Sequence, residues 1–136
     1  HHDITRCDFL AYMPKLKYLV LADTPLADIS PITACKELIF LELFLTRVSD
    51  YTPLLELTKL EDLNLCYTHG QKEVLMEMTW LKRLWWSPSA GKQPDLSRAL
   101  PDTLINVTTG SSTGGVWRKG QNYYDMRDML HAPYMN

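Results

Sequence analysis

The chain has 136 residues, of which 46% are hydrophobic and 22% are charged, and its formal net charge at pH 7 is −2. This length suits one domain with a continuous core. The charge argues against nucleic acid or an anionic membrane as the main partner, because both need a surplus of Lys and Arg. The most apolar stretch, Leu38 to Leu45, includes Glu42 and is far shorter than the roughly 20 residues of a membrane-spanning helix. We therefore expect no membrane insertion.

The first predicted element, residues 4–10, is the second half of a 22-residue repeat whose complete copies follow it. Its apolar residues stand one period before those of the next copy: Ile4, Cys7 and Leu10 precede Leu26, Ile29 and Ile32. The strand of this first copy is missing. We therefore expect a fragment of a longer protein, in which the strand Lys17 to Leu21 is an exposed sheet edge that is open to self-association.

Three complete copies follow, and they share three columns of leucine and one of threonine. The columns are Leu16, Leu38 and Leu60; Leu19, Leu41 and Leu63; Leu21, Leu43 and Leu65; and Thr24, Thr46 and Thr68. Self-similarity at a fixed period is the sequence signature of a repeat architecture. Asp28 and Asp50 also share a column, and we expect both to accept hydrogen bonds from backbone N–H groups at the start of a helical turn.

The first copy reads LxxLxLxxTxLxDIxPI, and over residues 3–108 the chain resembles the internalin-like class of bacterial leucine-rich-repeat proteins. The resemblance implies an α/β fold: a right-handed solenoid with parallel strands on its concave face and short helical turns on its convex face. Thr stands where the class usually has Asn. A threonine hydroxyl can still bind neighbouring backbone, although it offers fewer donors than an amide.

A fourth copy comes 21 residues after the third, with Leu81, Leu84 and Trp86 on the leucine columns. The missing residue falls between Thr68 and Leu75. We place a fifth strand 19 residues further on, with Leu100, Thr103 and Ile105 on the same columns and Thr108 on the threonine column.

The repeats end at residue 108, and residues 109–136 form a second region, a linker followed by a capping segment. Gly110 to Gly115 is rich in Gly, Ser and Thr. Tyr123, Met126, Met129 and Leu130 recur at helical spacing. We expect this helix to cover the open end of the last repeat, because solenoid ends need caps; a partner-binding helix is the alternative.

The sequence contains no complete motif for catalysis, cofactor binding or metal binding. Gly110 to Gly115 has the GxxxxG spacing of a phosphate loop, but Val116 and Trp117 follow it in place of Lys and Ser or Thr. Cys66 and His69 lie three residues apart, yet the repeat places them in different directions, and the acidic residues lack the spacing of a calcium loop. Cys7 and Cys35 fall on core columns. We predict no catalytic residue, no cofactor and no metal.

The residues that flank the leucines in each strand point away from the core and line the concave face. They mix aromatic and apolar side chains with a few charges, as protein-binding patches do. The candidate partner-binding residues are Tyr18, Val20, Phe40, Glu42, Phe44, Asp62, Asn64, Arg83 and Trp85.

The sequence thus favours a non-enzymatic module that binds a protein or peptide through its concave face, and the function comes from the family resemblance. Two alternatives remain: a structural spacer or stalk of a bacterial surface protein, in which neighbouring parts cover this face, and the recognition arm of an enzyme whose catalytic domain lies elsewhere. The resemblance to bacterial repeats favours the cell surface or secretion, with the cytoplasm as the alternative.

Overall fold

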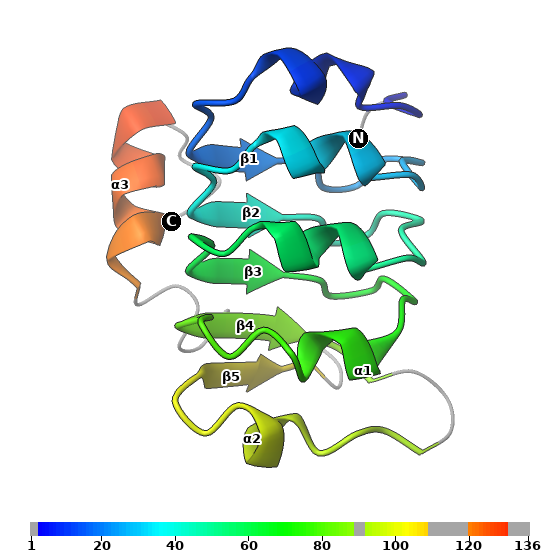
Figure 1. Ribbon diagram of the computed structural model, residues 1–136, viewed down its shortest axis with the longest axis vertical. Helices are drawn as coiled ribbons and strands as arrows, with labels where there is room; N and C mark the ends of the chain where they lie inside the picture. The colour runs from blue at the N-terminus through cyan, green and yellow to red at the C-terminus, as the bar shows by residue number, and fades with distance from the viewer. Residues whose placement is uncertain (1–2, 89–91, 109–119, 131–136) are drawn as a thin grey trace.

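The computed structural model describes residues 3–88, 92–108 and 120–130, and its core is a stack of five parallel strands (Figure 1). In chain order they are β1 (Tyr18–Val20), β2 (Phe40–Glu42), β3 (Asp62–Asn64), β4 (Arg83–Trp86) and β5 (Leu104–Val107). The strands pair in that same order, so each strand neighbours the copies before and after it. This is the solenoid that the 22-residue period predicts.

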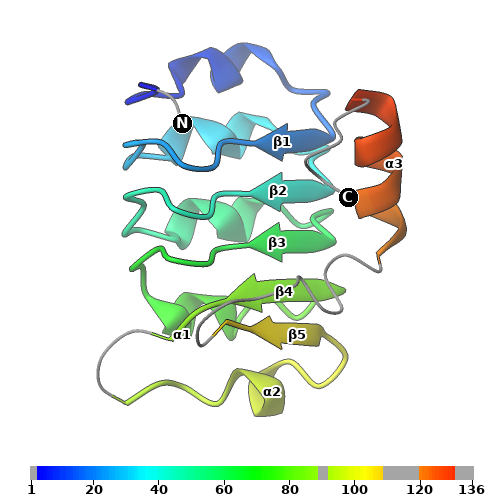
Figure 2. The same ribbon diagram turned by 180° about the vertical axis from the view of Figure 1, so that it is seen from behind.

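Short helical turns precede each strand and all lie on one face of the sheet (Figures 1 and 2). They are the 3-10 turns η1 (Asp8–Tyr12), η2 (Ser30–Ala34) and η3 (Thr52–Glu56), and the helical turns α1 (Lys72–Leu75) and α2 (Leu96–Ala99). Proline at the start of η2 and η3 fixes φ where no helical hydrogen bond is lost. None of the described helices is long and apolar enough to cross a membrane.

The main core lies between the sheet and these turns. Leu19, Leu41, Leu63 and Leu84 stand side by side in register, as their column predicts. Leu41, Leu63 and Leu84 are buried, whereas Leu19 on the edge strand β1 is only half-buried. Cys7 and Cys35 are both buried in this core, as expected.

The aspartates of the convex turns bind backbone as predicted. Asp28 Oδ1 accepts a hydrogen bond from the Ser30 amide (2.8 Å), and Asp50 Oδ1 accepts from the Thr52 amide (3.0 Å) and the Thr52 hydroxyl (2.7 Å). These bonds lower the pKa of both carboxyl groups, because they stabilise the charged form. The two aspartates therefore fix the start of η2 and η3.

The threonine column also forms local hydrogen bonds after each strand. The hydroxyls of Thr24, Thr46 and Thr68 each donate to the carbonyl three residues earlier, at 3.2, 2.7 and 2.6 Å. The residue before each threonine has a positive φ: 54° at Asp23, 57° at Leu45 and 58° at Tyr67. A left-handed residue and a threonine hydroxyl thus close each of these turns.

Leu45→Asn should stabilise the protein by about 1 kcal/mol, because leucine is strained in the left-handed region and asparagine tolerates it. Little burial is lost, since Leu45 is 47% exposed. Urea denaturation measures the change. The matched control is Leu104→Asn, which replaces a leucine of similar exposure in extended backbone and should bring no gain. Equal changes in stability for Leu45→Asn and Leu104→Asn would show that backbone strain at Leu45 is not the cause.

The fifth strand exists where we expected it, but its register differs from the prediction by two residues. Ile105 pairs with Leu84 and Val107 with Trp86, whereas the sequence suggested Thr103 beside Leu84 and Ile105 beside Trp86. Thr108 is consequently not on the threonine column. Its side chain lies on the same face of the sheet as that of Cys66, and the Thr108 hydroxyl is 3.5 Å from Cys66 Sγ. A two-residue shift keeps every side chain on its own face, so hydrophobic alternation alone cannot detect it.

Candidate recognition surface

The outer face of the sheet, the one turned away from the helical turns, carries the predicted recognition residues in two columns. Strand pairing aligns Tyr18 with Phe40, Asp62 and Arg83, and it aligns Val20 with Glu42, Asn64 and Trp85. The ninth residue, Phe44, packs against the same apolar cluster beyond the end of β2. Strand pairing thus places eight of these side chains on one face of the sheet, with Phe44 packed beside them.

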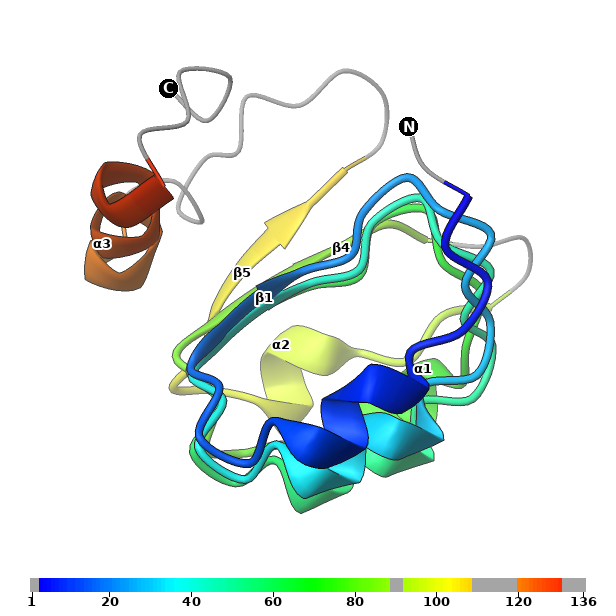
Figure 3. The same cartoon turned by 90° about the horizontal axis from the view of Figure 1, so that it is seen from above.

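This outer face is covered by the chain itself. Helix α3 (Gln121–Leu130) stands across the strands on the side opposite the helical turns (Figure 3). Tyr123 and Met126 of α3 form one buried cluster with Phe40, Cys66 and Trp85, and neither α3 side chain is more than 3% exposed. Burial of a methionine side chain alone stabilises a contact by about 1.5 to 3 kcal/mol.

The position of α3 corrects two expectations. The helix does not cover the open end of the last repeat: it lies alongside β1, β2 and β3 (Figure 1), while Leu104 and Val107 of β5 are 53% and 47% exposed. Phe40 and Trp85 are not surface residues outside a core, because they are 0% and 8% exposed. The apolar outer columns attract the amphipathic helix more effectively than the end of the sheet does.

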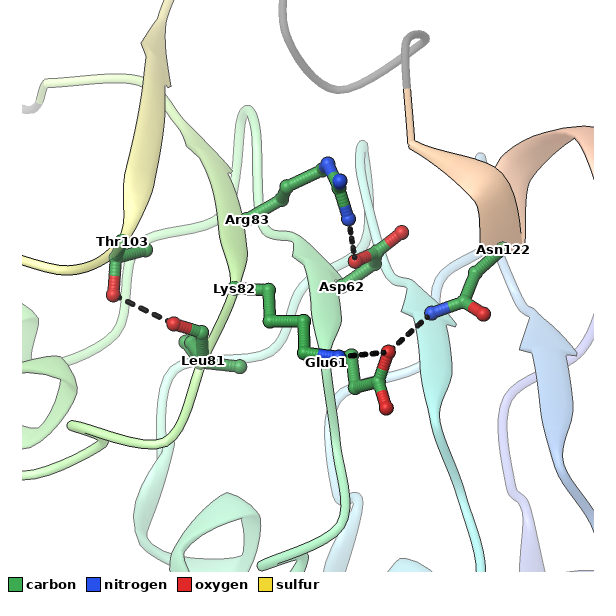
Figure 4. A network of polar contacts seen from close by, with 7 residues as sticks. All are labelled: Glu61, Asp62, Leu81, Lys82, Arg83, Thr103 and Asn122. Carbon is green, nitrogen blue, oxygen red and sulfur yellow. Dashed lines mark hydrogen bonds and ion pairs between the residues drawn. The ribbon is translucent and has the colours of Figure 1, made fainter.

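A buried ion pair lies under α3, between Asp62 of β3 and Arg83 of β4. Arg83 Nη1 donates to Asp62 Oδ1 at 3.2 Å, and the side chain of Asp62 is fully buried while that of Arg83 is 22% exposed (Figure 4). The second oxygen, Oδ2, is buried and has no hydrogen-bond partner among the described residues. Burial raises the pKa of Asp62 to about 6, and the Arg83 charge opposes this only in part.

A second set of polar contacts joins α3 to the edge of the same face. Asn122 Nδ2 of α3 donates to Glu61 Oε1 at 3.0 Å, and Lys82 Nζ forms an ion pair with the same oxygen at 3.2 Å (Figure 4). At the start of the helix, a Cβ on Gly120 would lie 2.8 Å from Nε of Arg83. Glycine at this position therefore lets α3 approach the Asp62–Arg83 pair closely.

Two further polar residues of the face are buried. Glu42 is 6% exposed and Asn64 is 2% exposed. Asn64 Oδ1 accepts a hydrogen bond from the Cys66 amide at 3.1 Å. Among the described residues, Glu42 and Asp62 are acidic side chains buried on this face, and Arg83 pairs with Asp62. This composition is typical of a surface that also meets water or a polar partner.

The shortened turn of the third repeat contains a buried polar group that the sequence did not predict. Lys72 is 4% exposed, and its Nζ donates to the Tyr51 hydroxyl (3.1 Å) and to the Thr68 carbonyl (3.3 Å). Within the described residues it forms no ion pair with a carboxylate. The neighbouring Gly70 has no room for a side chain, because a Cβ there would collide with the Tyr51 ring. The only signal in the sequence is the missing residue between Thr68 and Leu75.

The described residues contain no group of three His, Cys, Asp or Glu side chains that could hold a metal ion. Cys66 is buried on the outer face beside Thr108 and His69 is exposed, so the two do not form a pair. The glycine-rich segment Gly110 to Gly115, with Val116 and Trp117, lies outside the described residues.

Comparison with solved structures agrees with this architecture. Internalin C2 of Listeria monocytogenes superposes with a TM-score of 0.66 over 84% of this chain, at 20% identity. The chain has an internalin-like leucine-rich-repeat fold. Internalin F of the same organism superposes with a TM-score of 0.63 over 78% of the chain, at 22% identity.

The internalin-like chain spans 53% of the length of the first of these structures and 34% of the second. No protein-family model matches the sequence, and no curated protein matches it. The likeness therefore establishes the internalin-like fold. A fold does not determine what a surface binds, so any role of the outer face depends on its own residues.

Proposed function

We propose that this internalin-like chain is a non-enzymatic module that recognises a protein or peptide through the outer, concave face of its sheet. The observation that carries the proposal is that this face already holds a segment of the chain: Tyr123 and Met126 of α3 belong to one buried cluster with Phe40, Cys66 and Trp85. A face that buries two side chains of a helix has the depth and the apolar character that a partner needs.

The burial of Phe40 and Trp85 decides which variants can test the proposal. Alanine at either position should destabilise the protein, so loss of a partner would not separate binding from folding. Tyr18 and Val20 are only half-buried and lie in the same two columns, on the edge strand β1. Tyr18 and Val20 are therefore better positions than Phe40 and Trp85 for substitutions that test binding.

The test is affinity capture with quantified partners, comparing the wild type with a Tyr18→Ala/Val20→Ala variant. The matched control is Thr33→Ala/Leu55→Ala, which alters two half-buried side chains on the convex side. Melting temperatures establish that all three proteins are folded. The proposal expects a partner that weakens by about 1 to 4 kcal/mol with the outer-face variant and not with the control.

The same partners at the same affinity with all three proteins would contradict recognition through this face. That outcome would favour the alternative of a spacer or stalk in a bacterial surface protein. A partner that turned out to be the substrate of a linked catalytic domain would instead favour the alternative of a recognition arm.

We also propose a bacterial surface or secreted location, which the likeness to Listeria internalins supports. Self-association through β1 stays a prediction. β1 is the first strand of the sheet within the described residues, so one side of it has no paired strand there.

A further inference from the structure

The turns that follow β2 and β3 carry large apolar side chains on strained backbone. Leu45 (φ 57°) and Tyr67 (φ 58°) occupy the same position of successive repeats, and their side chains are 47% and 45% exposed. A left-handed conformation is unfavourable for a bulky residue, whereas glycine or asparagine adopts it at little cost. Residues that keep such strain are concentrated at binding and active sites. Leu45 and Tyr67 are therefore candidates for contact with a partner.

Hydrogen bonds between repeats hold both turns in place. The Leu45 amide donates to the Cys66 carbonyl at 3.0 Å, and the Tyr67 amide donates to the Ser87 hydroxyl at 2.7 Å. Each left-handed residue is thus tied to the repeat that follows it. A partner that binds these side chains does not have to order the turns first, which lowers the entropic cost of binding.

The two turns continue the outer face at the end away from α3. Helix α3 stands beside the ends at which the strands begin, whereas Leu45 and Tyr67 follow the ends at which β2 and β3 finish (Figure 1). Phe44, the candidate recognition residue next to Leu45, is half-buried and packs against the cluster that contains Phe40 and Trp85. A partner on the outer face therefore meets Leu45 directly beside Phe44.

A cation lies in the same turn as Leu45. Arg47 is exposed, and within the described part of the chain no other side chain pairs with its guanidinium. His69, at the same position of the next repeat, is also exposed. Tyrosine and arginine are among the residue types that contribute most to the energy of protein interfaces. The group that best matches a guanidinium is a carboxylate, because the two form a bidentate pair.

We propose that Leu45, Tyr67 and Arg47 form a docking rim of the recognition surface, and that this rim binds a peptide segment in which an aspartate or glutamate lies next to a large apolar residue. This inference rests on the proposed function and specifies the chemistry of the partner. The apolar side chain of the partner packs on Leu45 and Tyr67, and its carboxylate pairs with Arg47.

A displayed library of random peptides, selected on the full wild-type chain, tests this chemistry directly. The enriched peptides should contain an acidic residue next to an aromatic or aliphatic one. An enriched peptide is then synthesised with a fluorescent label, titrated with the full chain and followed by anisotropy. A library that yields no peptide bound above background, or only peptides without this pairing, would overturn the proposal.

Leu45→Asn separates binding from folding. It should weaken the peptide by about fivefold or more, while the relief of backbone strain raises the midpoint of urea denaturation. Loss of affinity in a more stable protein cannot come from unfolding. Tyr67→Asn should weaken the same peptide. Met76→Asn is the matched control, because it replaces an apolar side chain that is 38% exposed on the convex side, and it should leave the affinity unchanged. Equal affinities of the wild type and Leu45→Asn would contradict the docking rim.

Arg47→Ala tests the carboxylate contact. It should weaken the peptide about tenfold, and Arg47→Lys should restore only part of the affinity, because lysine cannot form the bidentate pair. Arg98→Ala is the matched control: it removes an exposed arginine of α2 and should leave the affinity almost unchanged. Equal losses with Arg47→Ala and Arg98→Ala would show that only the net charge matters, and the proposed pairing would be wrong.

The Tyr18→Ala/Val20→Ala variant distinguishes the docking rim from the proposed function. A peptide that depends on Tyr18 and Val20 but not on Leu45 or Arg47 would leave the proposed function standing and refute the docking rim. A peptide that depends on Leu45 and Arg47 but not on Tyr18 or Val20 would support the docking rim and count against recognition through the strands.

Discussion

Leu41→Ala should lower the free energy of unfolding by about 2 to 5 kcal/mol. Leu41 is fully buried and sits in the middle of a column of paired leucines, between Leu19 and Leu63. Truncation removes its own contacts and leaves a cavity that two neighbouring repeats line. The side chains of β2 are held on both sides by paired strands, so collapse into the cavity is restricted.

Chemical denaturation measures this loss, and Leu104→Ala is the control. Leu104 also lies in a strand, but it is 53% exposed, so its truncation should change stability by less than about 0.5 kcal/mol. Similar losses at the two positions would mean that the leucine column does not form the core.

The folded protein should lose stability as pH rises from 5 to 7.5, because Asp62 becomes charged in a site that excludes water. In the folded chain the pKa of Asp62 is raised to about 6, chiefly by burial. Proton binding therefore favours the folded state, and its stability falls as pH rises from the ordinary carboxyl value of about 4 through 6. At pH 7.5 the charged carboxylate opposes folding by about 3 kcal/mol, and roughly half of this is relieved at pH 5.

The groups that face Asp62 support this sign. Arg83 and Lys82 favour the charged form, and Glu61 opposes it. Urea denaturation of the full chain between pH 5 and 7.5 measures the effect. Asp62→Asn is the control, because its amide cannot ionise; a variant with the same pH dependence as the wild type would assign the effect to another group.

The sequence predicts the repeat architecture well because its signals are local and repeated. Each LxL places leucines on one face of a strand, and the 22-residue offset then fixes which strands are neighbours. The columns of the outer face follow from the same alternation, so the sequence alone suffices to identify their residues. The roles of Asp28 and Asp50 are predictable for a similar reason, since an Asp before a short turn binds the nearest free amides.

The features that the sequence did not predict depend on contacts between distant segments. Periodicity identifies α3 as amphipathic but cannot tell which of two apolar surfaces it covers, the outer columns or the end of the sheet. The predicted register of β5 is wrong because a two-residue shift changes no inside-outside pattern. Lys72 resembles an ordinary surface lysine in the sequence, and its burial depends on the hydroxyl of Tyr51 from the previous repeat.

The path of α3 changes how the whole stack should unfold. In a simple solenoid each repeat contacts only its neighbours, so melting can start at one end and spread, and partly folded forms accumulate. Here a segment that follows the last strand in the chain returns to Phe40 on the second strand, and Asn122 binds Glu61 beside the third. These long-range contacts link the terminal and early repeats, so that loss of one end removes support from the other. We expect the intact chain to melt as a single cooperative unit, and a loosened α3 to separate the melting of the two ends.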